Sequence, residues 1–250
     1  MKLKLFLLAI GIVCPNSSPW LSAQTNLAVT TNSIPARTNS AVLPVPHEAE
    51  RTQIVLQVAR DNPGACDVVF IGDSLVQRWE GNGRSVWEKY YGQRKALNLG
   101  VDGDRTQHVL WRFEQGQLNG LKPKVAVVMI GSNNCNRDEY SEGEVLAGVT
   151  AIVCEVRRRL PETKILLLGI LPRSQTFSAA RAKMLQVNLP LSRLQDGKMI
   201  HYLDIGPLFV EADGSISKSV MPDFSHLSER GYELWAAAIE PKLKALLEEK

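Results

Sequence analysis

Five apolar runs, separated by stretches with helical periodicity, constrain the fold of this chain more than any other feature. The runs are mostly continuous rather than alternating, as expected for strands buried on both faces. They are DVVFIG (67–72), KALNLG (95–100), KVAVVMIG (124–131), KILLLGI (164–170) and IHYLDI (200–205). Helical patterns lie at 104–116, 142–160, 175–195 and 228–248, and a stripe at Ile54, Val55, Val58 and Ala59 predicts an earlier helix. This order predicts a three-layer α/β/α, flavodoxin-like domain with five parallel strands.

The charge balance excludes some classes of partner. The 250 residues carry 29 Lys and Arg against 26 Asp and Glu, and the net charge of +3 is spread along the chain. Because no polybasic segment is present, we expect neither a nucleic acid nor an anionic membrane surface as partner. With 44% hydrophobic residues, the chain can bury the core of a single domain.

The N-terminus has the pattern of a signal peptide. Lys2 and Lys4 precede the apolar run LFLLAIGIVC, which is too short to span a bilayer, and Ala23 offers a small residue for cleavage before Gln24. We therefore expect a signal peptide at 1–23, a flexible leader rich in Thr, Asn and Ser at 24–43, and a folded domain at 44–250. An uncleaved anchor is the second interpretation, and a lipoprotein modified at Cys14 is less favoured. The mature protein is expected to be exported, to the periplasm or outside the cell.

The remaining cysteines are Cys66, Cys135 and Cys154, an odd number. In an oxidising compartment they permit one disulfide and one free thiol, without indicating which pair forms. No cysteine or histidine cluster has metal-site spacing, so the sequence implies neither a metal nor an organic cofactor. The DGD triplet at 102–104 lacks the further oxygen ligands of a calcium loop.

Polar side chains follow several of the predicted strands. Ser74 comes just after the first strand in FIGDSLVQ, and GVDGDRTQHVLWR and GSNNCNRD follow the second and third. Near the C-terminus, PDFSHLSERGYELW places Asp223 and His226 three residues apart before a helix. Because ligands bind at the carboxyl ends of parallel strands, these groups are expected on one rim.

The motifs FIGDSLVQ, NLGVDGDRT, IGSNN and DFSHLSERGY resemble the four blocks of the GDSL-type, or SGNH, hydrolase superfamily. GDRTQHVLWR followed by IGSNN is most similar to the branch that contains platelet-activating factor acetylhydrolase catalytic subunits and secreted bacterial esterases, some of which deacetylate carbohydrates. The resemblance covers roughly residues 65 to 240. Each block alone is weak, but four in order at strand ends form a specific signal. The GxSxG elbow of α/β-hydrolases is absent.

The resemblance implies a role for each matching residue. Ser74 matches the nucleophile, His226 the base that activates it, and Asp223 the acid that orients the histidine. The oxyanion hole would comprise the backbone N–H groups of Ser74 and Gly103 and the side-chain amide of Asn133. Singly, these residues also have structural explanations: a helix cap, a surface histidine, a turn and a loop.

Three further residues are candidates for substrate contact. Arg105 and Trp79 closely follow the catalytic blocks, although core packing explains Trp79 equally well. Asp102 stands where many relatives have Gly, beside the expected oxyanion donor. His108 and Cys135 are expected to pack in the interior, and His47 and His201 lack a matching context.

The resemblance implies a serine esterase that transfers a short acyl group, chiefly acetyl, from a carbohydrate or small-molecule ester to water through an acyl-enzyme. The loops after the strands look short and no lid is apparent, so we expect a shallow acyl pocket. A lysophospholipase or thioesterase is the alternative within enzymes, and a non-catalytic carbohydrate-binding protein is the alternative outside them. The oligomeric state is not indicated.

Overall fold

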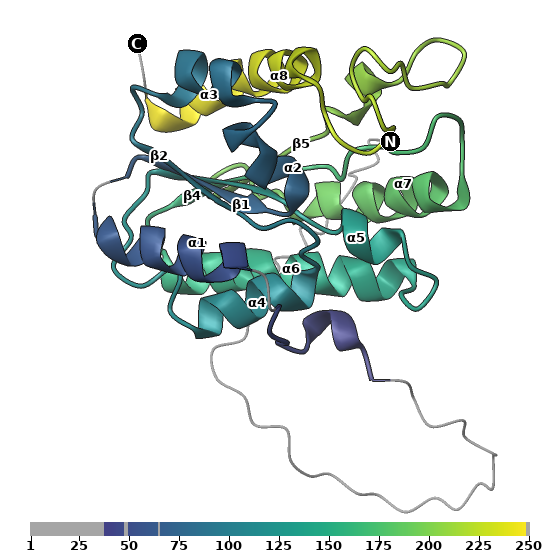
Figure 1. Cartoon of the computed structure of the whole chain (residues 1–250). Helices are drawn as coiled ribbons and strands as arrows, with labels where there is room; N and C mark the ends of the chain where they lie inside the picture. The colour runs from purple at the N-terminus through teal and green to yellow at the C-terminus, as the bar shows by residue number, and fades with distance from the viewer. Residues whose placement is uncertain (1–37, 48–49, 65, 249–250) are drawn as a thin grey trace, which may run out of the picture. The chain divides into compact units, whose positions relative to one another are not determined.

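The computed structural model of the chain describes residues 38–47, 50–64 and 66–248. From Asn39 onward the chain forms one compact unit (Figure 1). The predicted signal peptide (1–23) and most of the predicted leader (24–43) lie outside the described residues. The end of that leader is folded: residues 40–42 form the 3₁₀ helix η1 (Ser40–Val42), whose Ala41 is buried. The Thr106 hydroxyl donates a hydrogen bond of 2.7 Å to the Ala41 carbonyl, which ties this segment to the body of the fold.

The sheet has five parallel strands, as the sequence predicts. Their order is β2-β1-β3-β4-β5, the flavodoxin-like order in which the chain reverses direction across the sheet between β1 and β3. The strands are β1 (Val68–Gly72), β2 (Ala96–Gly100), β3 (Val125–Met129), β4 (Lys164–Leu168) and β5 (Ile200–Leu203). All residues of β1 and β3 are buried, which explains their uninterrupted apolar sequences.

The expected helices are present within a few residues of their predicted bounds. They are α1 (Glu50–Asp61), α4 (Thr106–Glu114), α6 (Glu142–Arg159), α7 (Ala179–Leu191) with the 3₁₀ helix η3 (Ser192–Leu194), and α8 (Glu229–Leu247). The sequence analysis did not predict the short elements α2 (Ser74–Gln77), η2 (Arg78–Glu80), α3 (Arg84–Tyr91), α5 (Ser132–Cys135) and η4 (Gly206–Phe209). Each spans eight residues or fewer, which is too short for helical periodicity to register.

The helices cover both faces of the sheet, as Figure 1 shows with α3 and α8 above it and α1, α4 and α6 below. Alternate residues of each strand enter two separate cores. Val69 and Ile71 of β1 pack with α1, α4, α6 and α7. Val68 and Phe70 pack with α2, α3 and α8. The domain is therefore a three-layer sandwich, and the prediction of its fold class is confirmed.

Two other findings bear on expectations from the sequence. Cys66 and Cys135 are free thiols in the interior, so the disulfide that the odd set of cysteines would permit is not formed in the structure. Among the described residues, no helix combines the length and the apolar character needed to cross a bilayer.

Candidate active site

Ser74 is placed by the sharp end of strand β1. The strand stops at Gly72, where an added Cβ would lie 2.3 Å from the carbonyl oxygen of Met129 on β3, so a side chain would not fit. Asp73 then caps helix α2 by accepting a hydrogen bond of 3.0 Å from the Leu75 N–H. Ser74 is the first residue of that helix and is only 6% exposed. It stands at the switch point between β1 and β3, where this topology forms its ligand sites.

His226 joins Ser74 to Asp223 in a continuous chain of hydrogen bonds. The distance from His226 Nε2 to Ser74 Oγ is 3.1 Å, and the distance from His226 Nδ1 to Asp223 Oδ2 is 2.7 Å. An ionised carboxylate at Nδ1 selects the tautomer with its proton there, which leaves the Nε2 lone pair directed at the serine hydroxyl. The structure thus brings together the three residues that the sequence analysis proposed as the catalytic set.

Helix α8 positions the histidine. Ser228 caps this helix, with its hydroxyl accepting from the Gly231 N–H at 3.2 Å, so His226 lies just before the helix start. Tyr232, fully buried in the first turns of α8, donates a hydrogen bond of 2.9 Å to the Leu75 carbonyl. This bond joins α8 to the helix that carries Ser74 and fixes the spacing between base and nucleophile.

Asp223 is held as a carboxylate. Although partial burial acts against ionisation, hydrogen bonds from the His226 ring and from the His226 and Ser225 backbone N–H groups lower the pKa of Asp223 to about 2. Asp223 Oδ1 receives the two backbone bonds, at 2.7 and 3.0 Å, while Oδ2 receives the ring. Because the backbone N–H groups bind Oδ1 and the His226 ring binds Oδ2, the Asp223 carboxylate stays ionised and its Oδ2 stays directed at the ring.

The expected oxyanion donors come from three loops on the same rim. The Ser74 N–H belongs to the first turn of α2, where no intrahelical acceptor exists. Gly103 has a φ of 76° in the loop after β2, a left-handed conformation that favours glycine. Asn133, in α5 after β3, donates through Nδ2 to the Asp104 carbonyl at 2.9 Å. That bond uses one amide hydrogen, and the second is left for an oxyanion.

Asp73 has an electrostatic environment that the sequence analysis did not anticipate. Complete burial raises the pKa of its carboxyl to about 7, despite the hydrogen bond from Leu75 N–H, and the negative charges of Asp104 and Asp102 add to the rise. The nucleophile therefore follows a carboxyl group that titrates near neutrality.

Comparison with known proteins identifies the family. A family model described as GDSL-like lipase/acylhydrolase matches residues 70–234. The chain belongs to this family. Human platelet-activating factor acetylhydrolase IB subunit alpha1 is 42% identical over 182 residues, which cover 72% of this chain and 77% of the relative. The rat alpha2 subunit is 38% identical over 217 residues, covering 82% of this chain and 91% of the relative. The chain is accordingly an ester hydrolase.

Solved structures show the same fold. A putative acylhydrolase from Bacteroides fragilis superimposes with a TM-score of 0.67 at 18% identity, covering 80% of this chain and all of the other. The acetylxylan esterase Axe2 from Geobacillus stearothermophilus gives a TM-score of 0.57 at 16% identity, covering 76% and 97%. At these identities, the likeness concerns the fold alone.

One expected substrate contact of the esterase is wrong. Trp79 is fully buried, and its ring packs against Phe70, Tyr232 and Trp235 at centroid distances of 6.4, 4.3 and 5.4 Å. Although Trp79 follows Ser74 by only five positions, the 3₁₀ turn η2 directs it into the core under α8. Trp79 is therefore a core residue and not a substrate contact.

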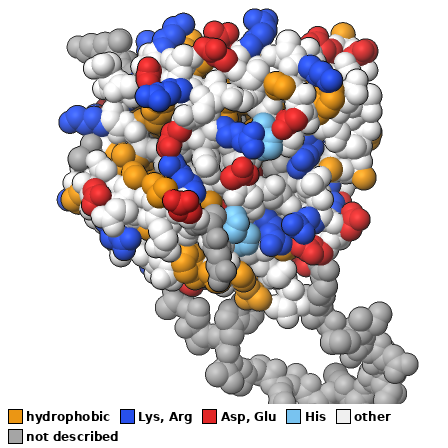
Figure 2. Space-filling model, viewed as in Figure 1, with side chains coloured by type: hydrophobic (Ala, Val, Ile, Leu, Met, Phe, Trp, Pro, Cys, Tyr) orange, Lys and Arg blue, Asp and Glu red, His pale blue; other side chains and the backbone are white. Residues whose placement is uncertain are grey.

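The other two expected contacts lie in the polar loop beside Gly103. Asp102 is exposed and forms an ion pair of 3.4 Å with Arg78. Arg105 donates to Glu139 at 3.0 Å and to the Tyr140 hydroxyl at 2.8 Å, which turns it toward the loop before α6. Figure 2 shows acidic, basic and histidine side chains close together on the face that it draws. Both residues belong to a polar surface, and Arg105 is already engaged.

The residues expected to pack do so. Burial lowers the pKa of His108 to about 4, although nearby Asp104 acts in the opposite direction, and the side chain is only 6% exposed. Burial also raises the pKa of the Cys135 thiol to about 12, so this cysteine is not a thiolate at neutral pH. His201 is buried on strand β5.

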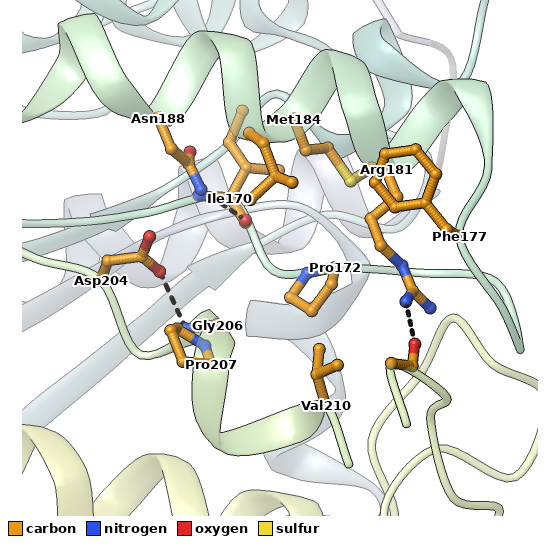
Figure 3. Close-up of a pocket in the computed structure, with 12 residues that line it drawn as sticks. Ile170, Pro172, Phe177, Arg181, Met184, Asn188, Asp204, Gly206, Pro207 and Val210 are labelled. Carbon is orange, nitrogen blue, oxygen red and sulfur yellow. Dashed lines mark hydrogen bonds between the residues drawn. The ribbon is translucent and has the colours of Figure 1, made fainter. Parts of the chain in front are cut away.

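The esterase also has an apolar cavity that the sequence analysis missed. Its volume is about 420 Å³, and it lies between α7 and the segments that follow β4 and β5 (Figure 3). Its polar groups are largely engaged with the backbone: Asn188 bonds to both N–H and C=O of Ile170, and Arg181 donates to the Gly214 carbonyl. The lining is otherwise mainly apolar, with Pro172, Phe177, Met184, Leu185, Pro207 and Val210. The expectation of short loops is wrong here, since the connection from β5 to α8 runs from 204 to 228.

Proposed function

We propose that the chain is an exported serine esterase that removes short acyl groups, chiefly acetyl, from a carbohydrate alcohol through an acyl-enzyme. The observation that carries the proposal is the hydrogen-bonded chain from Ser74 through His226 to Asp223, next to the loops of Gly103 and Asn133. A carbohydrate-binding protein without catalysis would have no use for this arrangement.

The reaction follows from the geometry. Ser74 Oγ attacks the ester carbonyl carbon while His226 Nε2 removes the hydroxyl proton, and Asp223 stabilises the resulting imidazolium. The tetrahedral intermediate collapses when the alcohol leaves with the proton from His226. A water molecule, deprotonated by the same nitrogen, then attacks the carbonyl carbon of the acyl-enzyme. The second tetrahedral intermediate collapses, releases the carboxylic acid and restores Ser74 with the proton from His226.

Stabilisation of the intermediate is assigned to three donors. The carbonyl oxygen becomes an oxyanion, for which the N–H groups of Ser74 and Gly103 and the second amide hydrogen of Asn133 are the proposed donors. Donors of this kind act most strongly when they need no reorganisation. The bond from Asn133 to the Asp104 carbonyl at 2.9 Å joins two of the three loops.

The names of similar proteins and the polar loop beside the proposed oxyanion hole both support this substrate class. The curated relatives are named acetylhydrolases, and one structural neighbour is named an acetylxylan esterase. The loop at Asp102–Arg105 is polar and partly exposed, which suits a hydroxylated alcohol better than a lipid tail. Export is supported by the sequence of residues 1–23, and a mature protein starting at Gln24 in the secreted fraction would establish it by mass spectrometry.

The apolar cavity favours a second candidate, a lysophospholipase or thioesterase. The segment that lines the cavity at Pro172 and Phe177 is bonded to the catalytic loop between these two residues: the Ser174 N–H donates to the Phe224 carbonyl at 2.8 Å, one residue after Asp223. Arg181 holds the same segment through the Arg173 carbonyl at 3.0 Å. A chain of methylenes placed there would gain about 0.8 kcal/mol per buried CH₂.

A chain-length series decides between the candidates. We expect kcat/KM for p-nitrophenyl esters to be highest for acetyl and to decline by butyryl, and acetylated xylo-oligosaccharides to release acetate. A rate that rises steadily through octanoyl would establish the second candidate instead. In that case Leu185→Asp, at the cavity, should lower the octanoyl rate and spare the acetyl rate. The Ser74→Ala variant, which lacks the nucleophile, gives the background rate of hydrolysis for every ester.

A further inference from the structure

A second histidine–carboxylate pair lies in the same loop region as the proposed oxyanion hole. His47 Nδ1 is 2.8 Å from Asp104 Oδ1. Asp104 is fully buried, and its other oxygen receives Arg112 Nη2 at 2.6 Å and Nε at 3.1 Å. The Asp104 carboxylate can only accept, so a neutral His47 ring in this geometry has its proton on Nδ1 and its lone pair on Nε2.

The His47 ring is held in place from several sides. The Val45 N–H donates to the Gln107 carbonyl at 3.2 Å, which fixes the backbone two residues earlier. The Thr52 hydroxyl donates to the His47 carbonyl at 3.0 Å. The imidazole stacks on His108 with a centroid distance of 4.8 Å and an interplanar angle of 26°. A side chain fixed in this way loses little conformational entropy when it binds a ligand.

The free edge of the ring lies beside Gly103. A Cβ built on Gly103 would be 3.3 Å from His47 Cε1 and 3.8 Å from Nε2. The side chain is 29% exposed, unlike His108 at 6%. The Nε2 edge therefore borders the loop whose N–H is assigned to the oxyanion, with part of the ring open to solvent.

A metal ion is a poorer explanation of this cluster. Ligand atoms of His47, Asp104 and His108 lie within 4.8 Å of one another. However, Arg112 already balances the charge of Asp104, and His108 Nδ1 accepts the Arg105 N–H at 3.1 Å. The lone pairs and the charge that a cation needs are thus in use.

A role as second base for Ser74 is also a poorer explanation, because His226 Nε2 is already 3.1 Å from Ser74 Oγ. Core packing does not account for the exposed edge of His47. What is left is a fixed, partly exposed acceptor beside the reaction centre.

We propose that His47 is a substrate-binding residue whose Nε2 accepts a hydrogen bond from a hydroxyl group next to the scissile ester. This rests on the proposed function and narrows its substrate class to alcohols with a neighbouring free hydroxyl, as in a partly acetylated sugar. A site built to pair with a substrate hydroxyl discriminates against an analogue that lacks it, since the acceptor is then left unpaired. With a partly exposed acceptor, loss of one such bond changes kcat/KM by about tenfold.

The test compares a monoacetylated methyl xyloside that has a free hydroxyl beside the ester with its deoxy analogue. The quantity measured is the ratio of kcat/KM for the two. We expect His47→Phe, which keeps a stacking ring but has no acceptor, to lower this ratio about tenfold, and His47→Gln, which retains an acceptor oxygen, to restore part of it. His201→Phe, on strand β5, is the matched control and should leave the ratio unchanged. Thermal unfolding of each variant separates loss of fold from loss of selectivity.

Each outcome has a separate meaning. A ratio that is the same in wild type and His47→Phe, with both xylosides cleaved, overturns the role of His47 and leaves the esterase assignment intact. Equal loss on both xylosides also overturns it, because His47 would then support the Gly103 loop rather than bind a hydroxyl. If wild type cleaves p-nitrophenyl acetate but neither xyloside, the carbohydrate substrate class fails, and with it the proposal.

Discussion

Each of the two histidine–aspartate pairs of this esterase contains a hydrogen bond between the histidine Nδ1 and the carboxylate. The burial and the other partners of the two carboxylates differ. The Nδ1-to-carboxylate distances are 2.7 Å for His226–Asp223 and 2.8 Å for His47–Asp104. Asp223 is 54% exposed and is stabilised by backbone N–H groups, whereas Asp104 is fully buried against Arg112. The distance alone does not make a catalytic pair: only His226 has a hydroxyl nucleophile at its second nitrogen.

The largest difference between the pairs should appear in turnover. His226→Ala removes the base and should lower kcat by roughly 10⁶-fold, as removal of the histidine of such a triad does. His47→Ala should cost far less on p-nitrophenyl acetate, whose alcohol has no hydroxyl. Steady-state kinetics of both variants, with circular dichroism to confirm the fold, measures the contrast. Comparable losses from the two would contradict this contrast between the pairs.

For the free energy of unfolding, the His47–Asp104 pair should matter more than the His226–Asp223 pair, the reverse of the order expected for turnover. Asp104→Ala leaves Arg112 charged and buried without its partner, which typically costs about 3–5 kcal/mol of unfolding free energy. Asp223→Ala removes three hydrogen bonds of a half-exposed carboxylate, where solvent screens the charge, so it should lower the urea midpoint less than Asp104→Ala while it damages activity. Urea unfolding followed by tryptophan fluorescence compares the two. A larger loss of stability at Asp223 would contradict the division of roles drawn from their burial.

Asn133 connects the surroundings of the two pairs, since it is the proposed side-chain donor to the oxyanion and its amide donates to the Asp104 carbonyl. Asn133→Ala should lower kcat by ~10²–10³ with little change in KM, the usual cost of one oxyanion donor. Asn134→Ala is unsuitable as a control because Asn134 is buried and bonded to the Thr106 N–H, so Ser132→Ala is the neighbouring control. A raised KM with intact kcat would make Asn133 a ground-state binding residue.

Asp73 extends the comparison to a buried carboxyl whose pKa is raised although the positive charge of Arg173 acts in the opposite direction, whereas Asp104 is paired directly with Arg112. Its pKa is raised to about 7, so between the ordinary carboxyl range and pH 7 the folded state binds more protons than the unfolded state. Stability contributed by protonated Asp73 is therefore lost as pH rises through about 7. Asp73→Asn, which keeps an acceptor for the Leu75 N–H, should flatten the decline in unfolding free energy between about pH 4 and pH 7. An unchanged slope would contradict the raised pKa.

The sequence was informative where a motif and a strand end coincide. Ser74, Gly103 and Asn133 follow β1, β2 and β3, and Asp223 and His226 precede α8, so a parallel sheet places all of them on one rim. The expected substrate contact of Trp79 was wrong because closeness to Ser74 in sequence does not determine where the side chain points after the 3₁₀ turn η2. The His47–Asp104 pair spans 57 positions, and no local pattern marks it. The cavity was missed because its walls are irregular segments, whose conformation depends on tertiary bonds such as those of Arg181.

The N-terminal segment has a consequence for the order in which the protein folds. Its anchors lie far along the chain: the Ala41 carbonyl accepts from Thr106, 65 positions later, and Asn39 Nδ2 donates to the Glu144 carbonyl, 105 positions later. Contacts that close long loops form slowly because much chain entropy is lost before they are made. Residues 39–47 are therefore expected to dock only after the first turn of α6, which contains Glu144, is in place. His47 travels with this segment, so its alignment against Asp104 belongs to the late steps of folding.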